Sequence, residues 1–300
     1  MARLGEHAVT ETRRVSPRSR SAPLPLSVSQ TRLWNLSRLA PDSPAYSELI
    51  TIRKAGPLDV EALRRALTEV VGRHEVWCTT FDTIDGVPHQ IVRKPTKVHL
   101  PLVDLTHLSL EDAAQRATEI AAADALHPYD LAEGPLIRPQ LIRIADDDHR
   151  LQLGLHHLVF DWTTLQRVVF AELTALYRSY ATGVPAVVGE SLPEPQAQYA
   201  DYTRWERDWV RGRETAARIA KWRCRLAGST PSSLPLDHPR PPSQTFVGGT
   251  IPLAIDHATA EGLRRAAGAA GASLFHALAA AYAWWLHLYA ARDRHRLRLL

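Results

Sequence analysis

A single stretch, residues 151–162, most constrains how this chain can fold. Leucines at alternate positions across Leu151–Leu155 are typical of a half-buried strand. Apolar side chains then recur at helical spacing, at Leu165, Val168, Val169, Leu173, Leu176 and Tyr177. Two adjacent histidines, His156 and His157, lie at the junction, and Asp161 or Thr163 is expected to cap the following helix. The sequence therefore predicts a rigid strand-to-helix turn that carries two imidazoles and a carboxylate.

The histidine pair by itself is open to a structural and a catalytic interpretation. Adjacent histidines in a globular chain are more often surface or satisfied core residues than catalysts. A metal site is disfavoured, because neighbouring residues of a strand point to opposite faces. The chain also lacks a nearby Cys or Glu at a ligand spacing such as HExxH. We predict no metal ligands here.

The order His-His-x-x-x-Asp, entered from a strand and left by a helix, resembles the core motif of the condensation domains of nonribosomal peptide synthetases. Their wider superfamily of chloramphenicol acetyltransferase-like acyltransferases shares this motif. Further stretches are similar to the family's SxxQxRLW, RHExLRTxF, FDL…GPL, YxDF…W and W…L…LPxDxPRP elements, and lie at 27–34, 73–81, 129–136, 198–205 and 221–241. Together they come in the family's order and cover residues 24–290. The chain is identified as a member of this family on their combined pattern.

The resemblance implies an α/β fold of the α+β, mixed-sheet type, with two lobes, of which the second is incomplete. We expect a disordered leader over 1–22, an N-terminal lobe with the motif over 23–180, a proline-rich connection over 181–247, and the start of a truncated C-terminal lobe over 248–300. The family's second lobe continues well beyond the position of Leu300. We hypothesise a frameshift near Arg292.

Local patterns predict several elements within these lobes. An amphipathic helix is expected over Asp59–Gly72, and a hairpin through the Asp85-Gly86 dipeptide. A second hairpin is predicted around the acidic triplet 146–148, and a single helix over Tyr199–Leu226. A first strand of the second lobe is expected over Gly248–Ile255. Ala269–Ala291 carries no charged residue, and we interpret it as a buried core helix in preference to a membrane span.

The resemblance also implies a reaction, in which an amine attacks a thioester to give an amide. Both acyl groups would arrive on 4′-phosphopantetheine arms of peptidyl or acyl carrier proteins, alongside an adenylation domain of the same assembly line, with no cofactor bound directly. By motif position, His157 is the candidate base, His156 packs or orients the turn, and Asp161 is structural. Substrate-channel candidates are Trp162, Arg73 and Ser27.

Two residues depart from the family's pattern. Trp162 stands where the motif has glycine, and Cys78 stands where the RHE element has arginine. If that glycine position has a positive φ, tryptophan there costs about 1–2 kcal/mol, and the indole would narrow the channel. Otherwise the backbone is unchanged and the ring packs outward.

Composition limits the other classes of function. The net charge of +4 comes without a basic stripe interleaved with aromatics, so we predict no nucleic-acid partner. Two cysteines without a CxxC pair indicate a reducing, cytoplasmic setting. We expect a monomer that does not bind a membrane.

Two alternatives to a carrier-dependent condensation domain stay open. One is an acyltransferase of the same superfamily that uses acyl-CoA donors, and the other is a non-catalytic remnant that binds a carrier protein. The run Phe160–Leu165 also resembles condensation domains that accept polyketide donors, and a donor delivered by a separate protein is a further hypothesis.

Overall fold

The computed structural model describes residues 15, 24–41, 43–185, 192, 194–228, 236–242, 249 and 251–290. Contacts divide the chain into two compact units, 1–212 and 213–300. The division falls within the segment predicted as the inter-lobe connection. The predicted leader lies outside the described residues, apart from Val15.

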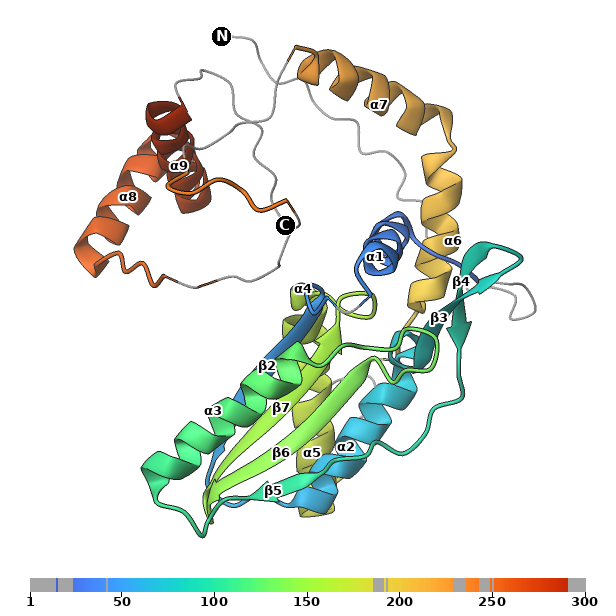
Figure 1. Ribbon diagram of the computed structural model, residues 1–300, viewed down its shortest axis with the longest axis vertical. Coiled ribbons are helices and arrows are strands. Elements are labelled where there is room, and N and C mark those ends of the chain that lie inside the picture. Colours follow the sequence, from blue (N-terminus) through green and yellow to red (C-terminus); the bar gives the residue numbers. More distant parts are fainter. Residues whose placement is uncertain are drawn as a thin grey trace. The chain divides into compact units, whose positions relative to one another are not determined.

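A four-stranded mixed sheet forms the centre of the first unit (Figure 1). Its strands lie in the order β2 (Ser47–Ala55), β7 (Asp148–His156), β6 (Ile137–Ala145) and β5 (Leu102–Asp104). The β2–β7 and β6–β7 pairs are antiparallel, whereas β5 runs parallel to β6. The mixed α/β class predicted from the sequence is therefore confirmed, as is the hairpin of β6 and β7.

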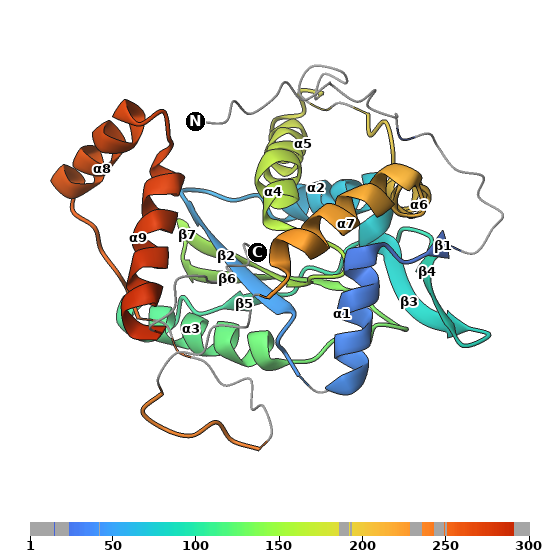
Figure 2. The same cartoon turned by 90° about the horizontal axis from the view of Figure 1, so that it is seen from above.

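Helices cover both faces of this sheet. α3 (Leu110–Leu126) lies on one face, and α2 (Val60–Arg73) and α5 (Phe170–Thr182) lie on the other, as Figure 2 shows from above. Strand alternation explains the two layers, because consecutive side chains of β6 point to opposite faces. Leu141 is buried in the larger core with α2 and α5, whereas its neighbour Ile142 is buried in the smaller core beneath α3.

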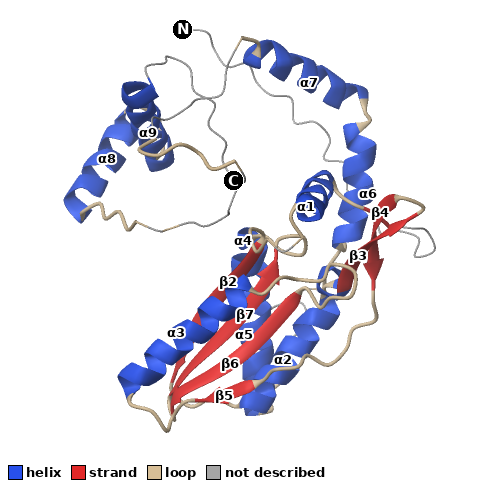
Figure 3. Ribbon diagram, in the orientation of Figure 1, coloured by secondary structure: helices blue, strands red, loops and turns tan. Residues whose placement is uncertain are grey.

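A second, three-stranded sheet lies in the same unit, with the order β1 (Leu24–Pro25), β4 (Val87–Val92) and β3 (Thr79–Ile84). Asp85 and Gly86 both have positive φ, of 51° and 77°, as the predicted hairpin turn requires. Figure 3 also shows the helices α1 (Val28–Leu39), α4 (Trp162–Thr164) and α6 (Tyr199–Val210) of this unit. Two short helical turns complete its described helical segments, the 3-10 turn η1 (Glu75–Cys78) and the π-helical turn η2 (Leu165–Val169).

The predicted single helix over Tyr199–Leu226 is wrong, because the structure has two helices there. α6 ends at Val210, and α7 covers Arg213–Leu226. The N–H of Gly212 donates to the Trp209 carbonyl oxygen at 3.0 Å, a tight turn that ends α6. A Cβ at position 212 would lie only 3.0 Å from that same oxygen, so the glycine permits the break.

The second unit contains α7, α8 (His257–Ala269) and α9 (Leu274–Ala290). The prediction of a buried helix over Ala269–Ala291 is correct about the helix and wrong about its burial, because most large apolar side chains of α9 are exposed. These are Phe275, Leu278, Tyr282, Trp284, Trp285, Leu288 and Tyr289. Residues 251–255 of the predicted first strand have no regular structure, and 248 and 250 lie outside the described residues.

Among the described residues, no single helix is both long enough and apolar enough to cross a membrane. α8 and α9 meet that criterion only together, with a bend of 102° between them.

Candidate active site

The histidine pair lies where β7 ends, as predicted. His156 is the last residue of the strand, and its N–H donates to the Leu136 carbonyl oxygen at 3.1 Å. The N–H of His157 donates to the Tyr46 carbonyl oxygen at 2.9 Å, so pairing with the chain before β2 continues one residue past the end of β7. Both backbones are thus fixed by neighbouring strands, which holds the two side chains in defined directions.

His156 is buried, and its environment is apolar and aromatic. Its Nδ1 accepts the Leu158 N–H at 3.2 Å, and its ring meets Tyr129 edge-on at 5.8 Å. Burial, reinforced by the neighbouring His157, lowers the pKa of His156 to about 4. The imidazole is therefore neutral at physiological pH, with its proton on Nε2, and it orders the turn.

Tyr129 also contacts Arg138 and Gly154. The Arg138 guanidinium lies 3.9 Å from the centre of the tyrosine ring. A Cβ at Gly154 would lie 2.8 Å from the Tyr129 hydroxyl oxygen, so glycine is required for this close approach. These contacts hold the Tyr129 ring that packs against His156.

The lowered pKa of His156 predicts a pH-dependent stability. Unfolding returns its pKa to about 6.5, so the unfolded chain binds a proton that the native chain excludes between pH 6.5 and 4. Stability is lost as the pH falls through that window and is unaffected by this group above it. Between pH 7.5 and 4.5, the free energy of unfolding should fall by about 2–3 kcal/mol more in the wild type than in His156→Asn. Urea unfolding at both pH values measures this difference, and equal falls in the two proteins would contradict it.

His157, in contrast, is partly open to solvent. Its side chain is 36% exposed, and its Nε2 lies 2.8 Å from Oε1 of Glu48. The ring stacks on Phe160 with 4.7 Å between centroids and 14° between planes. The two neighbouring histidines therefore differ in exposure, since His156 is buried and neutral whereas the His157 ring reaches the surface.

Asp161 and Trp162 begin the helix that follows. The Asp161 carboxylate accepts the Thr164 N–H at 2.7 Å, so of the two predicted caps, Asp161 and Thr163, it is Asp161 that caps the helix. No ion pair to Asp161 is found within the described part of the chain. Trp162 is 52% exposed and helical, and Asp85 is the only non-glycine residue with positive φ among those described. Tryptophan at this position therefore causes no backbone strain, and its ring faces outward.

Ser27 and Arg73, the other channel candidates, are both enclosed. Ser27 caps α1 in a capping box with Gln30, and its Oγ lies 2.9 Å from the Tyr199 hydroxyl. Arg73 Nε lies 3.1 Å from Oε2 of Glu172, and both side chains are less than one-tenth exposed. The structure gives both residues bracing contacts, and contact with substrate stays a prediction for them.

Two residues to which the motif comparison gave no role donate hydrogen bonds to the backbone of the histidine turn. The Gln30 side chain donates to the Leu158 carbonyl oxygen at 3.2 Å, and the Trp77 indole donates to the Val159 carbonyl oxygen at 3.1 Å. Both lie in the stretches similar to the opening and RHE elements of the family. The separate motifs therefore converge on the backbone between His157 and Asp161.

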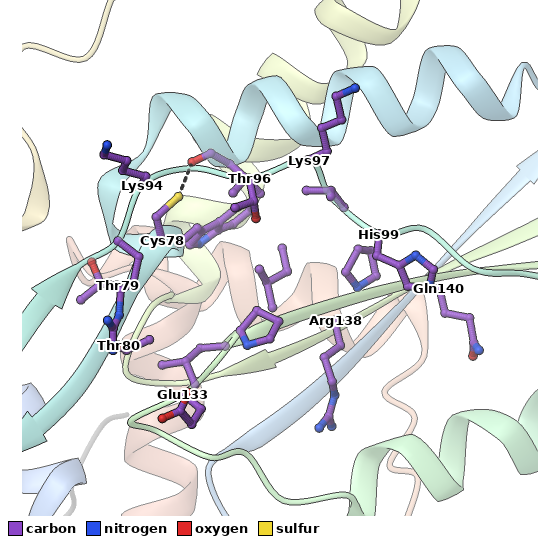
Figure 4. A pocket seen from close by; sticks show the side chains of 18 of the residues that line it. Cys78, Thr79, Thr80, Lys94, Thr96, Lys97, His99, Glu133, Arg138 and Gln140 are labelled. Carbon is purple, nitrogen blue, oxygen red and sulfur yellow. Dashed lines mark hydrogen bonds between the residues drawn. The ribbon is translucent and has the colours of Figure 1, made fainter.

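A cavity of about 560 Å³ lies between the segment that precedes β5 and the first half of β6 (Figure 4). Its wall includes Trp77 and Cys78. Burial raises the pKa of the Cys78 thiol, and Sγ contacts the Val71 carbonyl oxygen at 3.4 Å. Neither His157 nor Asp161 lines this cavity.

Comparisons with known proteins agree with this fold. The family model of the condensation domain matches residues 21–296. The chain is 36% identical over 285 residues to the malpibaldin synthetase of Mortierella alpina, a match that covers 94% of this chain and 5% of that protein. It is 35% identical to the phosphinothricin tripeptide synthetase PhsC of Streptomyces viridochromogenes, over 88% of this chain and 24% of that protein. The chain belongs to the condensation domain family.

Solved structures give the same result. The X-domain from teicoplanin biosynthesis is 28% identical, with a TM-score of 0.79 over 93% of this chain and 60% of that one. The first condensation domain of the calcium-dependent antibiotic synthetase, in complex with a substrate analogue, is 25% identical, with a TM-score of 0.72 over 89% and 60%. The chain thus spans about 60% of these structures and a quarter or less of the two curated relatives.

Proposed function

We propose that this chain forms an amide bond between an acyl thioester donor and an aminoacyl acceptor, each carried on a phosphopantetheine arm, in nonribosomal peptide synthesis. The observation that carries the proposal is the contrast between the two histidines. His156 is buried and orders the turn, which leaves the partly exposed His157 as the imidazole that substrates reach. Membership of the condensation domain family supports the reaction type.

The proposed reaction needs an amine that has lost its extra proton. A free α-amino group has a pKa of about 7.7–8.0, so much of it is an ammonium at neutral pH. The amine nitrogen attacks the thioester carbonyl carbon, the C–S bond breaks, and an amide C–N bond forms. His157 accepts the proton that the nitrogen loses and returns it to the departing thiolate. Atoms and charge balance without a cofactor.

The turn around His157 suits this role. Asp161 stabilises the helix start through its cap, and does not itself reach the amine in this proposal. Trp162 is 52% exposed and helical, so it causes no backbone strain in the turn. The function proposed here therefore accommodates tryptophan at the position where the family motif has glycine.

The partners proposed are a donor carrier protein, delivered on a separate chain, an acceptor carrier protein, and an adenylation domain that loads the acceptor. The setting proposed is the cytoplasm, with the chain acting as a monomer. Each relative named above is a synthetase by its name, and this supports an assembly-line context.

A direct assay tests the proposal. The 300-residue chain is incubated with an acyl-loaded carrier protein and a separate aminoacyl-loaded carrier. Mass spectrometry then measures the mass of the group carried on the phosphopantetheine arm of the acceptor. The expected result is an acyl-aminoacyl product on the acceptor carrier. Product from acyl-CoA donors alone would favour the CoA-dependent acyltransferase. Absence of product with every donor, from a folded chain, would favour the non-catalytic remnant.

A further inference from the structure

We propose that Glu48 is the positioning residue of His157, holding the imidazole as the Nε2–H tautomer so that Nδ1 is the atom that accepts the proton. Nothing in the motif resemblance assigns a role to Glu48, which lies more than 100 residues before the histidine pair. The inference deepens the function proposed above, and rests on it for the part that concerns catalysis.

Strand register places the two side chains together. β2 and β7 pair antiparallel with Ser47 opposite His156, and the His157 N–H bonds to Tyr46. His157 is therefore opposite Tyr46, and Glu48 is two residues further along the same strand, on the same face. Side chains in this diagonal relation across an antiparallel pair lie within reach of each other. The contact follows from the backbone pairing, with no unusual rotamer required.

The chemistry of the contact fixes the tautomer. A carboxylate only accepts hydrogen bonds, and a neutral imidazole has one donor nitrogen and one acceptor nitrogen. With Oε1 of Glu48 at 2.8 Å, Nε2 carries the proton and Nδ1 keeps the lone pair. No hydrogen bond to Nδ1 of His157 is found among the described residues.

A second contact fixes the ring plane. The imidazole lies nearly parallel to Phe160, with 14° between planes, so tilting the ring out of this plane would break the stacking. Glu48 is 48% exposed, so water shares the site and the carboxylate acts mainly through orientation. When Nδ1 takes a proton, the same carboxylate faces the resulting imidazolium, which is the arrangement that stabilises it.

The test compares Glu48→Leu, which removes the acceptor, with Glu48→Gln, which keeps an acceptor oxygen without charge. The matched control is Asp148→Asn, which removes a carboxylate paired with Arg53 at 2.9 Å at the far end of the same two strands. Long-range ¹H–¹⁵N correlation spectra of the full chain at pH 8 report the tautomer, with the His157 signals assigned by their loss in His157→Gln.

The wild type, Glu48→Gln and Asp148→Asn should show an unprotonated Nδ1 and a protonated Nε2 at His157. Glu48→Leu should show averaged signals from both tautomers. In the carrier-bound assay, Glu48→Leu should lower the rate of amide formation about 10-fold, a part of the general-base contribution, with a smaller loss for Glu48→Gln and none for Asp148→Asn.

The two proposals fail separately. A single Nε2–H tautomer in Glu48→Leu would overturn the role of Glu48, whatever the activity. A changed tautomer with an unchanged rate would overturn its part in the reaction. A wild type that makes no amide, yet whose tautomer responds to Glu48→Leu, would refute the proposed function and support the positioning.

Discussion

His157→Ala should lower the rate of amide formation by about 100- to 10,000-fold. This is the usual contribution of a positioned general acid or base. The loss should appear in kcat, because the imidazole acts on the reacting nitrogen and contributes little to binding the carrier-borne substrates. Single-turnover assays with preloaded donor and acceptor carriers isolate the chemical step and measure this loss directly.

The matched control is His89→Ala, which removes another half-buried histidine in the first unit. His89 lies on β4, and its Nδ1 contacts the Val87 carbonyl oxygen at 2.8 Å. This variant should keep the wild-type rate. Unchanged turnover in His157→Ala would remove His157 from the mechanism.

Features that depend on residues close together in the sequence could be predicted. The strand and helix around the histidine pair, the cap at Asp161 and the turn at Asp85-Gly86 all follow from local periodicity or from φ preferences. The order of the motif stretches identified the family, and the family in turn implied the mixed α/β fold. None of these inferences required knowing which strands pair.

The contacts that define the site were not predictable in the same way. Glu48 reaches His157 only through the pairing of β2 with β7, and Gln30 and Trp77 reach the turn through tertiary packing. Alternation along β2 would have shown that Glu48 shares a face with Tyr46, but no pattern reports its partner across the sheet. Side-chain contacts between distant segments require the register.

The errors have the same origin. The helical pattern over 199–226 is continuous in its apolar positions, and the break at Gly212 depends on a single backbone contact with Trp209. α9 is apolar enough to be a core helix, yet composition alone does not say what covers it. The local sequence pattern predicted the helical structure of these segments but not how each helix packs or where it breaks.

The second large effect concerns Arg73, which the motif comparison placed in the substrate channel. Arg73→Met should lower the free energy of unfolding by about 3–5 kcal/mol, because it leaves the buried Glu172 carboxylate without its guanidinium. Arg73 Nε and His74 Nε2 lie 3.1 Å and 2.9 Å from the same oxygen, Oε2 of Glu172. Urea unfolding followed by circular dichroism measures the change.

Arg64→Met supplies the control, since Arg64 pairs with Glu61 on the exposed side of the same helix, where a pair contributes about 0–1 kcal/mol.

The double variant Arg73→Met with Glu172→Met separates an effect on stability from an effect on catalysis. Removing both members of a buried pair avoids an uncompensated charge, so the double variant should be more stable than either single one. If amide formation then returns with stability, Arg73 acts by bracing α2 against α5. Restored stability without restored activity would place the guanidinium in the channel after all.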